Sequence, residues 1–130
     1  MGYLAGLVVA VFWMGLATAL RYARERSFQA TVLMLVASYY VLFAAMAGDV
    51  RASVAESLVA LGFIAIAVVG FKRWPWLTIA AITGHGMFDA VHHLVIENPG
   101  VPVWWPAFCG TFDVVAGVYL AVLMSARRKP

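Results

Sequence analysis

Long apolar stretches alternate with short polar ones along the whole chain. Five of the apolar stretches are long enough to cross about 30 Å of hydrocarbon, which takes roughly 20 residues at 1.5 Å per residue. The pattern therefore predicts an all-α protein, a polytopic bundle of five transmembrane helices that forms one integral membrane domain over residues 1–130. The predicted spans are residues 3–20, 28–47, 53–71, 75–96 and 107–124.

The composition agrees with a protein that is surrounded by lipid. Apolar residues make up 65% of the chain and charged residues 12%, and the mean hydropathy is +0.92. A soluble domain of this length needs more polar surface than six acidic and nine basic residues provide. We therefore expect membrane lipid as the immediate partner and the cell inner membrane as the location.

The positions of the basic residues indicate how the spans are oriented, because Lys and Arg in short loops collect on the cytoplasmic side. Only Arg51 lies on the opposite side from the other basic residues. This distribution predicts an N-terminus outside and a C-terminus in the cytoplasm, and it explains the net charge of +3 without a nucleic-acid partner. A cleaved signal peptide is the less favoured interpretation of the first span, since its basic residues follow the apolar run. The basic residues on the cytoplasmic side are Arg21, Arg24, Arg26, Lys72, Arg73, Arg127, Arg128 and Lys129.

The fourth predicted span carries four ionisable residues on one face. At 100° per residue, His85, Asp89, His92 and His93 fall within about 100° of one another. A further carboxylate, Asp113, lies in the last span at a similar depth, about 10 Å from the outer end. An Asp inside hydrocarbon costs roughly 2.5 to 3.5 kcal/mol on insertion scales, so these residues are functional candidates.

Imidazoles and carboxylates at this spacing favour a divalent metal ion. Asp89 with His93 at i+4, or with His92 at i+3, places two ligands on one helical turn, and Asp113 completes a site of nitrogen and oxygen donors. Zinc, iron or copper suits such a site, with one position left for water. His85 lies about 12 Å from His93 along the helix axis, so we expect it to be a deeper ligand, a partner of a ligand or a proton carrier.

Four residues on other spans are candidates to support this site by hydrogen bonding or proton transfer. Tyr39 and Tyr40 reach a similar depth from the second span, and Glu56 lies nearer the outer surface in the third. Cys109 shares a face of the last span with Asp113 and with small residues such as Gly110, which allow two helices to approach closely.

The same residues can also have purely structural roles. At least one of the two adjacent histidines can be an interfacial residue, and the two aspartates can serve only to lock helices together. Cys109 can be a small packing residue, because it is the single cysteine of the chain. Glu56 can be a solvated helix end.

Several kinds of site are disfavoured by the sequence. All three histidines lie in one predicted helix, so no bis-histidine haem is expected within one chain. A retinal Schiff base needs a lysine inside a span, and the spans contain none. Glycine-rich phosphate loops, nucleophile elbows and HExxH pairs are also missing from the sequence.

The connection between the last two spans is rich in prolines and aromatic residues. Pro99, Pro102 and Pro106 stiffen it, and Trp104 and Trp105 prefer the boundary between lipid and water. Because it lies above the polar face of the fourth span, it is a candidate lid; a rigid aromatic connector is the alternative.

One part of the chain resembles the core of a family of small bacterial multi-pass membrane proteins. That part is residues 84–113, which read GHGMFDAVHHLVIENPGVPVWWPAFCGTFD, with NPGVPVWWP as the most distinctive run. The resemblance implies that the outer loop and its two flanking helices form the functional region, and it implies no reaction. The spacing of His85 and Asp89 is also similar to an HxxxD element of relatives of intramembrane CAAX proteases. Their paired glutamates are missing here, so protease activity does not carry over.

Two classes of function fit these observations. The first is an intramembrane His/Asp site near the outer leaflet that binds a divalent metal and, as an enzyme, activates water or oxygen against an apolar or lipid-like substrate, with His85 or Asp113 moving protons. The second is a non-enzymatic subunit that handles protons or metal, or a structural component of a larger membrane complex. Five short helices barely enclose a site, so a homo-oligomer or a larger complex is expected.

Overall fold

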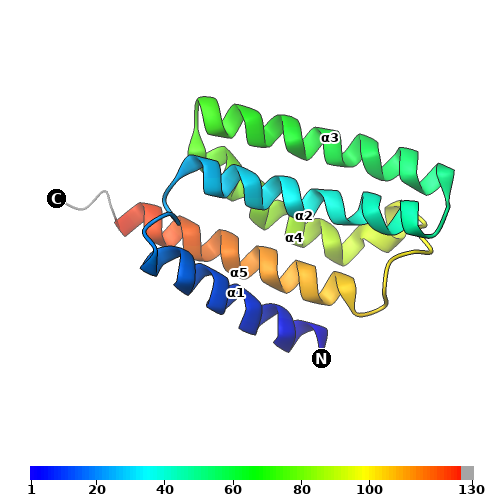
Figure 1. Ribbon diagram of the computed structural model, residues 1–130, viewed down its shortest axis with the longest axis horizontal. Coiled ribbons are helices and arrows are strands. Elements are labelled where there is room, and N and C mark those ends of the chain that lie inside the picture. The colour runs from blue at the N-terminus through cyan, green and yellow to red at the C-terminus, as the bar shows by residue number, and fades with distance from the viewer. Residues whose placement is uncertain (127–130) are drawn as a thin grey trace.

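The computed structural model of the protein describes residues 1–126 and consists of five helices joined by short connections (Figure 1). The predicted all-helical architecture is therefore confirmed. The helices are α1 (Gly2–Ala19), α2 (Arg26–Met46), α3 (Val50–Lys72), α4 (Pro75–Val95) and α5 (Trp105–Ala126).

Local sequence explains where α3 and α4 begin. Gly48 adopts a left-handed conformation, with φ of 70°, in the turn after α2. The Asp49 side chain then accepts a hydrogen bond of 2.9 Å from the backbone N–H of Ala52 and caps α3. This cap starts α3 at Val50, three residues before the start that hydropathy predicts. Pro75 occupies the first turn of α4, where its missing N–H breaks no helical hydrogen bond.

Four of the helices, α1, α2, α3 and α5, are long and apolar enough to cross a membrane. Their outer faces carry large apolar side chains; on α1, for example, Val8, Val11 and Phe12 are about 60% exposed. Exposed apolar surface on this scale is typical of a protein whose solvent is lipid. Helix α4 has a similar length of 21 residues, but its threonine, histidine and aspartate side chains lower its hydropathy below that of the other four.

Helix α4 lies against α5, α3 and α2, whereas α1 lies mainly against α5. The helix with the polar face therefore packs against three other helices. In agreement with the predicted amphipathic pattern, its buried residues include His85, Asp89 and His92, while Met87 and Leu94 are 66% and 75% exposed.

Successive helices run in opposite directions, so the connections gather at two ends of the bundle (Figure 1). The described basic residues of the α1–α2 and α3–α4 connections, from Arg21 to Arg26 and at Lys72 and Arg73, lie at one end. Arg51 lies at the other end, next to the first turn of α3. Arg127, Arg128 and Lys129, which belong to the same predicted cytoplasmic group, fall outside the described residues.

Small residues bring α4 and α5 close together, as the sequence predicts for this face of α5. A Cβ atom added to Gly86 would lie 2.8 Å from the backbone oxygen of Gly110 and 2.9 Å from Cβ of Asp113. A Cβ added to Gly117 would collide with the Thr83 hydroxyl. Backbone contact at this distance requires glycine, and it sets the polar face of α4 directly against α5.

Candidate metal centre

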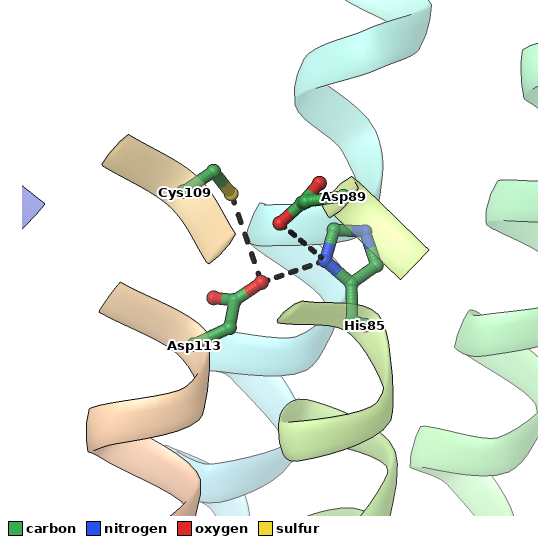
Figure 2. A group of neighbouring side chains, drawn as sticks. All are labelled: His85, Asp89, Cys109 and Asp113. Carbon is green, nitrogen blue, oxygen red and sulfur yellow. Dashed lines mark hydrogen bonds and ion pairs between the residues drawn. The ribbon is translucent and has the colours of Figure 1, made fainter. Parts of the chain in front are cut away.

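One imidazole and two carboxylates meet where α4 and α5 touch (Figure 2). His85 and Asp89 lie one turn apart on α4, and Asp113 faces them from α5. Nδ1 of His85 lies 2.7 Å from Oδ2 of Asp113 and 3.7 Å from Oδ2 of Asp89. The His85 side chain is 1% exposed and both carboxylates are 0% exposed. The helices thus seal this group from the surroundings.

Cys109 adds a sulfur to the same group. It lies one turn before Asp113 on α5, and its Sγ donates to Oδ2 of Asp113 at 3.7 Å (Figure 2). One ligand atom from each of His85, Asp89, Cys109 and Asp113 lies within 4.8 Å of the others. Donors that share one tetrahedral zinc ion at 2.0 to 2.3 Å lie about 3.3 to 3.8 Å apart. Small side-chain adjustments therefore suffice for these residues to hold one metal ion.

Each carboxylate keeps one oxygen that makes no hydrogen bond within the described part of the chain, Oδ2 of Asp89 and Oδ1 of Asp113. Among residues 1–126, the ion pairs of both carboxylates are with His85 alone. Buried polar atoms are usually paired, and buried charge is costly when it is not compensated. A group with two carboxylates and one imidazole calls for further positive charge, from protons or from a cation.

Tyr40 of α2 fixes the orientation of one carboxylate. Its hydroxyl donates to Oδ1 of Asp89 at 2.5 Å, and the side chain is 2% exposed. Oδ2 of Asp89 remains on the side of His85. The neighbouring Tyr39 faces another way; it is 38% exposed, and its ring lies 5.0 Å from that of Trp105.

A second buried pair, His92 and Glu56, joins α4 to α3 beside the first group. Nε2 of His92 lies 2.7 Å from Oε1 of Glu56, with both side chains 3% exposed or less. Asn98 of the outer loop donates to the same Oε1 at 2.9 Å and to the backbone oxygen of Tyr40 at 3.0 Å. The interpretation of Glu56 as a solvated helix end is therefore wrong, because neighbouring helices and the loop enclose it.

The structure brings together three of the five predicted ligands, His85, Asp89 and Asp113, and separates the other two. His92 is engaged by Glu56, and His93 is exposed. Asp89 lies four residues after His85 and four before His93, so helical spacing alone offers it either histidine. Packing of α5 beside His85 decides between them, because it supplies Asp113 on that side.

A groove of about 960 Å³ runs beside the candidate centre, along α4 and α5 and under the outer loop. Asp89 and His92 contribute to its wall, as do the apolar Met87, Val114 and Val115. Gly86, which has no side chain, is also part of this wall. The groove is thus a largely apolar space whose wall includes Asp89, while the Asp89 side chain itself is 0% exposed.

The residues that cover this groove are prolines and valines of the loop rather than the tryptophans predicted as a lid. Pro99, Pro102 and Val103 line it. Trp104 is 54% exposed and is not among the described lining residues, whereas Trp105 begins α5 and is 8% exposed.

Sequence reasoning missed Asn98 as a member of the site. The Asn98-Pro99-Gly100 run signals a helix stop, and Gly100 N–H does donate to the Asn98 side chain at 3.1 Å. An asparagine in such a turn has its amide N–H₂ left over, and here that group reaches Glu56 and Tyr40. The turn at Asn98 could therefore have been recognised in the sequence, but its contacts with Glu56 and Tyr40 depend on how the helices pack.

No family model, curated protein or solved structure matches the chain. The resemblance to small bacterial membrane proteins therefore stays a prediction.

Proposed function

We propose that this protein binds one divalent metal ion inside the membrane, between α4 and α5. The ligands are His85, Asp89 and Asp113, with Cys109 as a fourth donor. The observation that carries the proposal is the meeting of two fully buried carboxylates, each with an oxygen that makes no hydrogen bond in the described structure, around a single imidazole. A cation supplies the positive charge that such a group needs. Zinc accepts nitrogen, oxygen and sulfur donors in a four-coordinate site, and iron or copper suits a similar set.

In this proposal α4 is the fifth span, and the protein lies in the inner membrane with its N-terminus outside. The 21 residues of α4 extend about 31 Å at 1.5 Å per residue, enough to cross the hydrocarbon. Enclosure by three other helices offsets the cost of its polar face. The gathering of Arg21, Arg24, Arg26, Lys72 and Arg73 at one end supports a cytoplasmic assignment for that end, which places the metal centre nearer the outer leaflet.

As an enzyme, the protein would use the ion to activate water or oxygen against an apolar or lipid-like substrate. The apolar groove supports this function, because its wall is formed by residues of α4 and α5 and includes the proposed ligand Asp89. His85 and Asp113 already share a hydrogen bond, so they are placed to move the proton that such a step requires.

A non-enzymatic function is favoured by Cys109. If its sulfur joins the other three donors, four protein ligands complete a tetrahedral ion and leave no position for water, as in structural zinc sites. The protein would then hold or deliver metal, or carry protons, as a subunit of a homo-oligomer or larger membrane complex.

Metal analysis of the purified protein tests the proposal. We expect about one equivalent of metal per chain after growth with zinc, iron and copper, with most of it lost in Asp89→Asn and Asp113→Asn. Two variants serve as controls and should keep the metal, Glu97→Gln at an exposed loop carboxylate and His93→Ala at the exposed histidine. Helical, monodisperse wild-type protein that neither contains metal nor takes it up on titration would overturn the proposal.

A further inference from the structure

We propose that Glu56 and His92 are positioning residues that hold Asp89 in the orientation the metal centre needs, and that they connect this orientation to the outer loop. The inference rests on the proposed metal site and goes beyond it, because neither residue lies in the group of four donors. It follows from a continuous series of contacts from Glu56 to Asp89.

The series begins at a single carboxylate oxygen. Oε1 of Glu56 accepts hydrogen bonds from Nε2 of His92 at 2.7 Å and from Nδ2 of Asn98 at 2.9 Å. One atom of α3 thus fixes a side chain of α4 and a side chain of the outer loop. Because Glu56 is 2% exposed, water does not compete for these bonds.

The imidazole that Glu56 holds is stacked on Tyr40. The rings of His92 and Tyr40 are nearly parallel, at 11°, with centroids 3.9 Å apart. Phe88 packs edge-on against the same imidazole, at 5.5 Å and 87°. Asn98 holds the backbone of Tyr40 as well, through its hydrogen bond to the carbonyl oxygen. Both the ring and the main chain of Tyr40 are therefore placed by partners of Glu56.

Tyr40 passes this placement to the metal centre. Its hydroxyl occupies Oδ1 of Asp89, which leaves Oδ2 as the oxygen that faces His85. The terminal torsion of an Asp side chain is broad and roughly two-fold, so a carboxylate without such a clamp rotates more freely. Partners that orient a metal ligand commonly change metal affinity by about 10- to 100-fold when removed.

The same residues reach the groove. His92, Asn98 and Pro99 line it, and the loop is seated where Gly100 packs against the backbone oxygen of Phe43. A molecule in the groove therefore contacts the residues that determine how Asp89 is presented.

The test compares metal affinities of metal-free protein, titrated with Zn²⁺ in competition with a chromophoric chelator. Glu56→Ala and His92→Ala should bind about 10- to 100-fold more weakly than wild type. Glu56→Gln keeps the accepting oxygen and should stay within about 3-fold, well below the loss typical of a missing partner. His92→Phe keeps the ring stack without the link to Glu56 and should fall between His92→Ala and wild type.

Gln29→Ala is the matched control. Gln29 is also a fully buried polar residue of the bundle, but it donates to the backbone oxygen of Ala23, which lies just before the start of α2. Its loss should lower stability without changing Zn²⁺ affinity. Glu56→Ala and His92→Ala affinities equal to that of Gln29→Ala would overturn the proposal, as would a Glu56→Gln affinity as weak as that of Glu56→Ala.

A wild-type protein that contains no metal and takes up no zinc, iron or copper would end the proposed function, but the positioning of Tyr40 could still be tested. The hydrogen bond of the Tyr40 hydroxyl can be followed by NMR in metal-free protein with ¹³Cζ-labelled tyrosine, its signal assigned with Tyr40→Phe. Glu56→Ala and His92→Ala should shift that signal, and Gln29→Ala should not. An unshifted signal in both variants would refute a positioning role.

Discussion

His85 and Asp113 share a hydrogen bond of 2.7 Å that joins α4 to α5 inside the bundle. With Asp113 ionised, Nδ1 of His85 carries the shared proton. The same nitrogen faces oxygens of both Asp89 and Asp113, so it is the one that would bind an ion held by these carboxylates. A metal bound through Nδ1 must therefore displace this proton.

Metal binding is accordingly expected to release a proton. Isothermal titration of metal-free protein with Zn²⁺ in buffers of different ionisation enthalpy should show a net release, and the apparent affinity should weaken as the pH is lowered. Binding with no proton exchange at any pH would mean that the ion does not engage His85 through this nitrogen.

Asp89→Asn should have opposite effects on the metal-free and metal-bound protein. Without metal, the substitution removes one of two buried carboxylates, while the amide oxygen of the new side chain can still accept from Tyr40, so stability should be unchanged or higher, by about 1 kcal/mol. With Zn²⁺ at 100 times its dissociation constant, wild type gains about 2.7 kcal/mol that the variant lacks. Thermal unfolding in detergent, with chelator and with Zn²⁺, should thus reverse the order of the two proteins.

The control for this reversal is Glu97→Gln, the same change of acid to amide at an exposed position. It should leave the order of stabilities alone in both conditions. A strongly destabilised Asp89→Asn in chelator would show that the carboxylate is needed for folding rather than for an ion.

The close contact of α4 with α5 predicts different effects for two glycines of the same helix. Gly86→Ala should cost about 1 to 3 kcal/mol, because the new methyl group meets the Gly110 carbonyl and the helices must separate. Gly84→Ala, where nothing lies within 4 Å, should be neutral or stabilise the helix by up to about 1 kcal/mol. Unfolding by denaturant in micelles measures both, and metal affinity should fall only in Gly86→Ala.

Much of the fold was predictable because hydropathy and helix signals act locally. The length of the apolar runs gives the five helices, and Pro75 gives the start of α4. The start of α3 was predicted three residues too late. The sequence alone does not distinguish an aspartate that caps a helix, as Asp49 does, from one that lies in solvent. The burial of Asp89 and Asp113 also followed from their place in apolar helices.

The partners of the ionisable residues were less predictable, since they depend on which helices pack against α4. Spacing gives Asp89 a histidine on either side, and only the position of α5 selects His85 over His93. Glu56 was open to interpretation as a solvated residue because it lies near the start of α3, close to the outer surface. In the structure, α4 and the turn at Asn98 cover it. Side-chain pairing between non-adjacent helices carries no periodic signal in the sequence.

The orientation of α4 can be tested with single cysteines in a Cys109→Ala background. Trp74 at the start of α4 and Glu97 after its end are both exposed. If α4 crosses the membrane as proposed, a membrane-impermeant maleimide added outside intact cells should label Glu97→Cys and should label Trp74→Cys only after permeabilisation. Labelling of both positions from the same side would mean that α4 does not cross.

Whether Cys109 binds the ion decides between the two proposed functions, and Co²⁺ makes the bond visible. A thiolate ligand gives Co²⁺ an intense charge-transfer absorption in the near ultraviolet, which Cys109→Ser should abolish while Co²⁺ still binds. Tetrahedral Co²⁺ with that band would favour metal holding or delivery, because Cys109 together with His85, Asp89 and Asp113 leaves no position for water. Co²⁺ bound without the band would leave His85, Asp89 and Asp113 as the ligands and an open position beside the groove, which is the arrangement that catalysis requires.

Since Cys109 is the single cysteine of the chain, alkylation gives an independent check. If Cys109 binds the ion, metal should protect the thiol from a small alkylating reagent. If it does not, metal should change the reactivity of the thiol little.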